Sequence, residues 1–204
     1  MIMISKGYAL DDAAIATMFE DRKQLFVDLL GWNVPVTDGR YEIDQFDGDY
    51  ATYLIACHSE GRHKASLRLL PTTGPHILGD LFGELCDHDV PRGPAIAEIT
   101  RLCLPTPLGA ACRLAVRNQL ISAMVDYALA SDISALTGVV SRDFLEHILA
   151  MGWDCAALGE PRFMSGGWLG AFRIEITRDT PALLGARGIY TPSTIAAAPA
   201  RVAA

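Results

Sequence analysis

The sequence predicts an α/β (α+β) protein: a three-layer α/β/α sandwich in which helices cover both faces of a mixed central sheet. Two observations lead to this prediction. Apolar segments of strand length alternate with segments of helical period, and two early strands, residues 50–57 and 65–70, are separated by only a short polar turn. The 204 residues contain no repeat or linker, so we expect one domain over residues 1–190 and a flexible tail over residues 191–204.

The first helix is expected over residues 11–30, where apolar side chains recur at helical spacing. Asp11 or Asp12 is suited to cap its N-terminus, and Gly31 is suited to end it. Residues 33–49 contain one proline and two glycines, and we expect them to form a loop.

The two early strands are predicted to form an antiparallel hairpin through the polar turn at residues 58–64. Prolines interrupt the chain at residues 71–75, and residues 77–86 suit a short helix. The later elements are expected as strands at residues 95–104, 133–140, 153–158 and 168–176, and as helices at residues 110–130 and 142–151.

The composition argues against several functional classes. A net charge of −7 disfavours a nucleic-acid partner, which would require a basic face. No apolar segment is long enough to cross a bilayer and no secretory signal is recognisable, so we expect a cytoplasmic protein without a membrane partner. The five cysteines and five histidines lack the spacing of a metal site or a disulfide framework, so no metal or cofactor is expected.

The segment Tyr41–Asp49, YEIDQFDGD, concentrates negative charge directly before a predicted strand. It places three carboxylates, those of Glu42, Asp44 and Asp47, around the single aromatic residue Phe46. Carboxylates packed this closely need cations to neutralise them. These cations come from the protein itself, from a metal ion or from a positively charged substrate, and the missing metal-ligand spacings disfavour the metal.

Three arginines are candidate partners for these acids. Arg22 precedes Phe26 by one helical turn, so the two side chains share a face, and Arg68 alternates with leucines in a predicted strand. Arg101 follows Glu98 by three residues, so a bulge is required for both to reach one cleft. Taken singly, the three have ordinary interpretations: a solvated arginine, an edge-strand arginine and a local ion pair.

Taken together, these positions follow a recognisable order. The chain has R-x-x-x-F, then W after a glycine, E-x-D-x-F-D, S-L-R-L-L-P-T, a helix with L-F, and E-I-T-R. This order resembles the LuxI family of acyl-homoserine lactone synthases, which make quorum-sensing signals (autoinducers), over most of residues 8–160. The matching residues are Arg22, Phe26, Trp32, Asp44, Asp47, Arg68, Phe82, Glu98 and Arg101. Where the family commonly has S-R-F, this chain has Thr100 and Leu102 around the arginine, which leaves the choice of acyl chain open.

The resemblance implies a GNAT-like acyltransferase fold and a defined reaction. Such an enzyme joins an acyl group to the amine of S-adenosyl-L-methionine (SAM), closes the lactone and releases methylthioadenosine. The resemblance also implies that SAM, with its sulfonium and α-ammonium, is the cation beside the acidic segment, while Asp44 and Asp47 pair with the arginines as well. Glu98 and Arg101 are then the implied catalytic residues, with Glu98 taking the proton of the amine. The residues implied in SAM binding are Arg22, Phe26, Trp32, Asp44, Asp47, Arg68 and Phe82.

The acyl chain is expected in an apolar pocket formed by Leu102, Met124, Thr137, Val139 and Leu149. Taken alone, Met124, Val139 and Leu149 are better explained as ordinary core, and Thr137 is the exception. The hydroxyl of Thr137 suits a 3-oxo group on the acyl chain, and it also suits a hydrogen bond to a backbone carbonyl.

The acyl donor is either acyl carrier protein or acyl-coenzyme A. Acidic carrier protein would prefer a basic docking surface, whereas residues 142–178 interleave arginines with acids. Two rival functions are a GNAT-like N-acyltransferase for another amine and a non-catalytic SAM-binding homologue. The missing glycine-rich pyrophosphate loop argues against the first, and the presence of Glu98 and Arg101 argues against the second.

Overall fold

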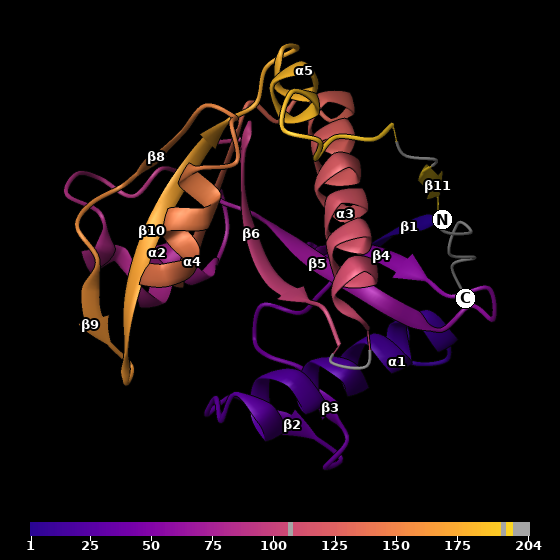
Figure 1. The fold of residues 1–204 in the computed structure, drawn as a ribbon. Coiled ribbons are helices and arrows are strands. Elements are labelled where there is room, and N and C mark those ends of the chain that lie inside the picture. Colours follow the sequence, from indigo (N-terminus) through magenta and orange to yellow (C-terminus); the bar gives the residue numbers. More distant parts are fainter. Residues whose placement is uncertain (106–107, 193–194, 198–204) are drawn as a thin grey trace. The chain divides into compact units, whose positions relative to one another are not determined.

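The computed structural model describes residues 1–105, 108–192 and 195–197 (Figure 1). The described chain divides into two compact units. The first contains residues 1–68, 101–123 and 195–197, and the second contains residues 69–100 and 124–192. The chain passes from one unit to the other inside three elements, which are β5 (His63–Pro71), β6 (Ile96–Cys103) and α3 (Ala110–Ala130).

The first unit is built around a short mixed sheet. Strand β1 (Ile2–Lys6) pairs antiparallel with β4 (Thr52–Cys57) and parallel with β11 (Ile195–Ala197), and β5 lies next to β4. The residues of β4 are buried except for the half-buried Cys57, as expected for a continuous apolar strand covered on both faces. The predicted strands at residues 50–57 and 65–70 are therefore confirmed, whereas β1 and β11 were not predicted.

A long helical segment follows β1. Helix α1 (Ala13–Arg22) begins at Asp12, whose carboxylate accepts hydrogen bonds from the N–H groups of Ala14 and Ile15. The π-helix η1 (Lys23–Leu29) continues it without a break, and Gly31 follows with a φ of 68°. The predicted cap and stop are confirmed, and the wider π-helical turns in the second half were not predicted.

The expected loop over residues 33–49 was partly wrong, because it contains a small hairpin. Strands β2 (Val36–Thr37) and β3 (Tyr41–Glu42) pair antiparallel. The turn between them has positive φ angles at Asp38 and Gly39, a conformation that these residue types adopt more easily than most. This hairpin delivers Glu42 and the acids that follow it to their positions.

The second unit has the strand order β6, β7 (Ala135–Ser141), β10 (Gly167–Glu175) and β8 (Cys155–Ala157), with β9 (Arg162–Met164) also paired to β10. Strands β6 and β7 are parallel, and Glu98 is the register partner of Thr137. Strand β10 is antiparallel to β7, β8 and β9. The unpredicted strand β9 forms a hairpin with β10.

The helices of the second unit differ in how well they were predicted. The bounds of α3 agree with the prediction at both ends, and α4 (Arg142–Leu149) ends two residues earlier than expected. The predicted helix at residues 77–86 is instead α2 (Ile77–Leu81) followed by the 3₁₀ turn η2 (Gly83–Leu85). Helix α5 (Thr180–Gly185) was not predicted.

Of the tail expected over residues 191–204, residues 195–197 form β11, while residues 193–194 and 198–204 lie outside the described residues. Among the helices of the described chain, none combines the length and apolar character that a membrane crossing requires. Over the same residues, no group of three or more His, Cys, Asp or Glu side chains is arranged to hold a metal ion.

Candidate active site

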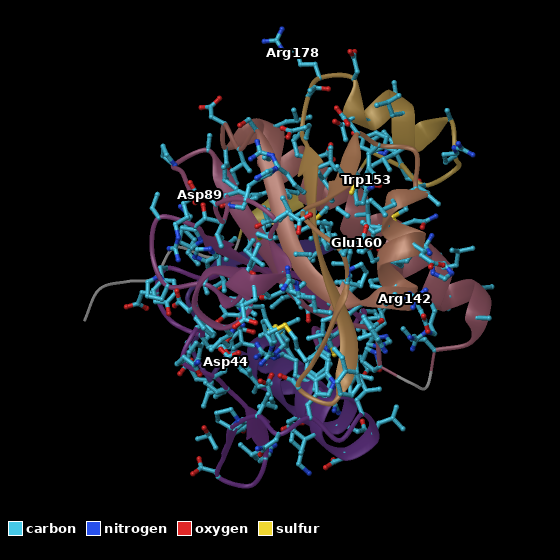
Figure 2. All side chains as sticks on the ribbon, turned by 90° about the vertical axis from the view of Figure 1, so that its left-hand side faces the viewer. Asp44, Asp89, Arg142, Trp153, Glu160 and Arg178 are labelled. Atoms are coloured by element: carbon cyan, nitrogen blue, oxygen red, sulfur yellow. The ribbon has the colours of Figure 1, made fainter. Side chains whose placement is uncertain are left out.

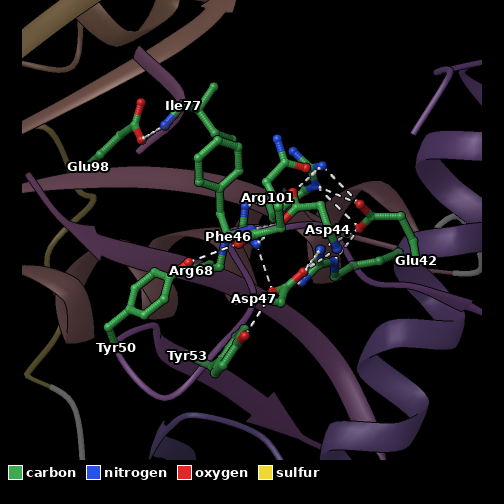
Figure 3. A network of polar contacts seen from close by, with 12 residues as sticks. Glu42, Asp44, Phe46, Asp47, Tyr50, Tyr53, Arg68, Ile77, Glu98 and Arg101 are labelled. Atoms are coloured by element: carbon green, nitrogen blue, oxygen red, sulfur yellow. Dashed lines mark hydrogen bonds and ion pairs between the residues drawn. The ribbon is translucent and has the colours of Figure 1, made fainter. Parts of the chain in front are cut away.

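Asp47 is part of a buried cluster of charged side chains in the first unit (Figure 3). Its Oδ1 and Oδ2 lie 3.0 and 2.9 Å from Nη1 and Nη2 of Arg22, which makes a two-point ion pair. Oδ1 also lies 2.7 Å from Nη1 of Arg68 and accepts a 2.8 Å hydrogen bond from Oη of Tyr53. Oδ2 accepts a 2.9 Å hydrogen bond from the N–H of Asp44. These donors use the whole acceptor capacity of the carboxylate.

Arg101 joins the other two acids of the cluster. Its Nη2 lies 2.9 Å from Oε1 of Glu42 and 2.7 Å from Oδ2 of Asp44. Asp44 also forms a two-point pair with Arg68, at 2.7 and 3.0 Å, and Glu42 accepts a 2.6 Å hydrogen bond from Nε of Arg22. The contacts therefore close into a ring of alternating charge, in the order Arg22, Glu42, Arg101, Asp44, Arg68 and Asp47.

This ion-pair ring answers the question that the acidic segment raises. Every carboxylate of the ring touches two of its arginines, and every arginine touches two of its carboxylates, so the formal charges of the ring cancel. The protein's own arginines therefore neutralise the acids, which corrects the expectation that the substrate supplies this positive charge. Arg22 comes from the end of α1, Arg68 from β5 and Arg101 from β6, so the ring also ties these elements to the acidic loop.

The ring lies almost entirely out of solvent. The side chains of Arg22, Arg68, Glu42 and Asp47 are at most 1% exposed, and that of Arg101 is 9% exposed. Burial by itself would raise the pKa of Asp47, but the charges of Arg22 and Arg68 outweigh it and hold that pKa well below its usual range. Burial likewise opposes the charge of Arg22, and Asp47 and Glu42 raise its pKa above the ordinary value.

Arg101 has an unusual backbone conformation. Its φ of 50° lies in the left-handed region, which costs a non-glycine residue about 1 kcal/mol or more. The regular pairing of β6 with β7 runs from Ile96 to Ile99, two residues earlier. The left-handed conformation of Arg101 therefore lies just beyond this regular pairing, and the bulge expected between Glu98 and Arg101 stays a prediction.

Two aromatic rings lie beside the Arg101 guanidinium. Phe26 and Trp32 are stacked, with ring centroids 4.6 Å apart and planes inclined by 16°. The guanidinium carbon of Arg101 lies 5.6 Å from the Phe26 centroid and 5.7 Å from the Trp32 centroid, within the range of cation–π attraction. Phe26 is buried and Trp32 is 44% exposed, so a flat aromatic surface at the edge of the ring is open to solvent.

The second unit contains Glu98, the residue predicted to move a proton. Its side chain is buried, and its Oε2 and Oε1 accept hydrogen bonds of 2.7 and 2.6 Å from the N–H groups of Ile77 and Leu78 at the start of α2 (Figure 3). These two bonds fix the orientation of the carboxylate. The pairing of β6 with β7 sets Glu98 directly beside Thr137.

Residues predicted for the acyl pocket are found in both units. Val139 packs with Phe82 around the buried Leu78, Leu85 and Ala171 in an apolar cluster of the second unit. The buried Oγ1 of Thr137 has no hydrogen-bond partner among the described residues. In the same unit Met124 is buried on α3, and Leu149, on α4, is 37% exposed. Leu102 is half-buried in the first unit. Phe82, which was predicted to contact SAM, belongs to the apolar cluster of the second unit, whereas the ion-pair ring belongs to the first.

The sequence assigned no site role to Glu42, which belongs to the ring, or to Tyr53, which contacts it. Glu42 was recognised as one of the acids but was given no role, although it links Arg22 to Arg101. Tyr53 was interpreted only as part of a strand, yet its hydroxyl donates to Asp47. The available signal was a single hydroxyl-bearing ring in a buried apolar strand, because the buried hydroxyl of Tyr53 needs a hydrogen-bond partner.

Comparison with known proteins identifies the family. A model of the autoinducer synthase family matches residues 7–180. The chain belongs to this family. The acyl-homoserine-lactone synthase of Ralstonia nicotianae is 34% identical over 191 residues, which cover 91% of this chain and 93% of the relative. That of Rhizobium etli is 34% identical over 155 residues, covering 74% and 73%.

Solved structures agree with this assignment and with the predicted fold class. BjaI, a coenzyme A-dependent acyl-homoserine lactone synthase solved with SAM and isopentyl-CoA, has a TM-score of 0.85 at 25% identity, covering 99% of this chain and 95% of BjaI. A putative N-acetyltransferase from Lactobacillus plantarum has a TM-score of 0.61 at 14% identity, covering 87% and 98%. The second likeness concerns the fold alone. The predicted mixed α/β, GNAT-like fold and the predicted family are confirmed.

Proposed function

We propose that this autoinducer synthase makes an N-acyl-L-homoserine lactone from SAM and an acyl thioester, with release of methylthioadenosine. The observation that carries the proposal is the ion-pair ring with its stacked aromatic pair. The ring contains all four charged residues that the family resemblance assigns to SAM, and each of them is paired with two partners in the ring. SAM bound to the similar enzyme BjaI supports the choice of substrate.

The ring acts as a rigid support and not as a direct binder at every position. Asp47 accepts four hydrogen bonds and also forms an ion pair with Arg68, so its contribution is to hold Arg22 and Arg68 in place. Arg101 and Trp32 are more accessible, and we assign direct contact with SAM to them. The exposed face of Trp32 suits the adenine or the sulfonium, because aromatic faces attract cations.

The first chemical step is N-acylation. The α-amine of SAM must be neutral to attack, and since free α-amines have a pKa of about 7.7–8.0, this deprotonation costs little near neutral pH. The nitrogen attacks the thioester carbonyl, the N–C bond forms, and the C–S bond breaks to release the thiol. We assign the proton of the amine to Glu98, which takes it directly or through one water, and this proton then returns to the departing sulfur to give the free thiol. The two backbone hydrogen bonds of Glu98 keep the carboxylate oriented for this role.

The second step is lactonisation. The carboxylate oxygen of the acylated SAM attacks the side-chain carbon next to the sulfonium. The new C–O bond closes the five-membered ring as the C–S bond breaks, and the electron pair leaves on the sulfur of methylthioadenosine. The nucleophile and the leaving group both belong to the substrate, so this step requires no nucleophilic side chain from the protein.

Residues of the second unit are the candidates for binding the acyl chain and its carrier. The apolar cluster around Leu78, Leu85 and Ala171 includes Phe82 and Val139, and we assign the acyl chain to this cluster, next to Thr137. Coenzyme A is the favoured carrier because BjaI, which is coenzyme A-dependent, resembles the whole chain. Charges of both signs are exposed on this unit, at Arg142, Glu160 and Arg178 (Figure 2), which gives little preference for an acidic carrier protein.

Expression in a bacterium that makes no such signals tests the proposal. Mass spectrometry of the culture extract is expected to show an N-acyl-homoserine lactone, and the mass of the acyl group identifies the donor that the cell supplied. If no lactone forms there, and none forms from a panel of acyl-coenzyme A and acyl carrier protein donors with purified protein, the proposal is wrong. An N-acylated amine other than a lactone would indicate the alternative, an N-acyltransferase for another substrate.

A further inference from the structure

His63 connects strand β5 to helix α1 at two points. Its backbone N–H donates a 2.9 Å hydrogen bond to Oγ1 of Thr17, and its Nδ1 lies 2.6 Å from Oδ2 of Asp21. Thr17 and Asp21 are one helical turn apart, so His63 contacts a single face of α1. The other ring nitrogen, Nε2, lies 2.9 Å from Oγ of Ser66, on the same strand as His63.

The order Asp21, His63, Ser66 is that of a hydrolase triad, but the environment excludes nucleophilic chemistry. Ser66 is 1% exposed and His63 is 4% exposed, so no substrate reaches the serine hydroxyl. Burial lowers the pKa of His63, so its ring is neutral at pH 7. Nδ1–H then donates to Asp21, and Nε2 accepts the hydroxyl hydrogen of Ser66. The groups therefore form a fixed cross-link.

This cross-link runs beside one edge of the ion-pair ring. Asp21 directly precedes Arg22, and Ser66 lies two residues before Arg68, so it points to the same face of β5. The ion pairs of Asp47 with Arg22 and with Arg68 join α1 to β5. The contacts of His63 with Asp21 and with Ser66 join the same two elements at neighbouring positions. The two links share the same helix and the same strand.

We propose that His63 is a positioning residue for the SAM site, acting through Asp21 to hold α1, and with it Arg22, in register with β5. The inference rests on the proposed function, since it assigns the ring to SAM and not to the acyl donor. Arg22 needs such help because its guanidinium must meet Glu42 and Asp47 at once. Asp47 is also paired with Arg68 of β5, so a shift of α1 along β5 strains the Arg22–Asp47 contact. His63 itself touches no substrate.

Substitutions at His63 distinguish positioning through the hydrogen bond to Asp21 from a role in packing alone. The amide nitrogen of His63→Asn replaces Nδ1 and keeps the bond to Asp21, whereas the longer His63→Gln keeps more volume and reaches toward Ser66. Positioning through Asp21 predicts a KM for SAM about tenfold higher in His63→Leu and His63→Gln, from the loss of a hydrogen bond to a charged group, and near wild type in His63→Asn. The KM for the acyl donor and kcat stay within about twofold, as only the SAM side is displaced.

Steady-state kinetics of these variants, with thermal unfolding of each, decides the matter. The control is Tyr190→Phe, which removes a 2.7 Å hydrogen bond to Asp126 in the second unit and should leave both KM values unchanged. If His63→Gln outperforms His63→Asn, or if both KM values and kcat change together, His63 is only a packing residue and the inference fails. If His63→Leu does not fold, the comparison of the KM for SAM between His63→Asn and His63→Gln still tests the inference. Wild-type protein that makes no lactone would instead refute the proposed function.

Discussion

Arg22 and Asp47 form a two-point ion pair, with both side chains at most 1% exposed and the N–O distances at 3.0 and 2.9 Å. Asp47→Asn keeps the shape but removes the charge, and it turns an acceptor into a donor that faces two buried arginines. We expect a loss of about 3–5 kcal/mol in the free energy of unfolding, the usual result of breaking a buried pair. Urea denaturation measures it.

The same pair gives a pH dependence with a defined sign. Because the folded-state pKa of Asp47 is held below the ordinary 3.8, its contribution to stability is complete above that pH and is lost as the pH falls toward the folded value. Asp47→Asn should lack this acid-sensitive part. The control is Asp28→Asn, which breaks an exposed 2.9 Å pair with Lys23 and should cost at most about 1 kcal/mol. Equal losses in the two variants would contradict the account of the ring.

Trp32→Ala tests the aromatic surface next to Arg101. Trp32 is 44% exposed, so its removal should change stability little, but it removes the face assigned to SAM. We expect the KM for SAM to rise about tenfold, equivalent to about 1.4 kcal/mol of cation–π or stacking energy. Trp168→Ala, at a tryptophan of the second unit that is 52% exposed, is the matched control. A KM for SAM that rises equally in both variants would argue against a specific role for Trp32.

Glu98→Gln separates proton transfer from structure. Loss of a general base lowers kcat by about 10²–10⁴-fold, while the equilibrium affinity for SAM should change by less than about threefold. The amide nitrogen of Gln must face either the Ile77 or the Leu78 N–H, so about 1–3 kcal/mol of stability is lost as well. Rates are therefore normalised to folded protein, with exposed Glu160→Gln as control. Equal losses in kcat and SAM affinity would indicate a structural Glu98.

Thr137→Val tests whether the buried hydroxyl recognises the acyl chain. Its Oγ1 has no hydrogen-bond partner among the described residues, so its removal should change the free energy of unfolding by less than about 1 kcal/mol. Thr180→Val removes an acceptor for the Thr177 N–H and should cost about 1–3 kcal/mol. If the Thr137 hydroxyl donates a hydrogen bond to a 3-oxo group, its replacement lowers the ratio of 3-oxo to unsubstituted product in a competition assay. An unchanged ratio would leave Thr137 as core.

The parts of the fold that were predicted from sequence are those with strong local signals. Helix α3 is 21 residues long with a sustained period, and α1 has an Asp at its cap and a Gly at its stop. Strand β1 is five residues long, and what stabilises it is pairing with β4 and β11, distant in sequence. Such tertiary pairing leaves no local pattern to detect.

The candidate site was also predicted only in part, because some of its features have no signal in the local sequence. The acids at residues 42–47 form a local cluster that the sequence shows directly, whereas the three arginines, distant in sequence, were grouped with them only through the family resemblance. The sequence did not predict that Glu42 closes the ring or that Asp47 accepts four hydrogen bonds and an ion pair, because both depend on which elements the fold brings together. The positive φ of Arg101 was not predicted, because a left-handed conformation at a non-glycine residue has no signal in the local sequence.

The stoichiometry of a single reaction tests the central claim most directly. Purified protein is incubated with SAM and a saturated short-chain acyl-coenzyme A, and lactone, methylthioadenosine and free thiol are quantified over time. The account predicts that all three appear at equal rates, because acylation releases the thiol and lactonisation releases methylthioadenosine. Thiol release without methylthioadenosine, or methylthioadenosine without lactone, would contradict it.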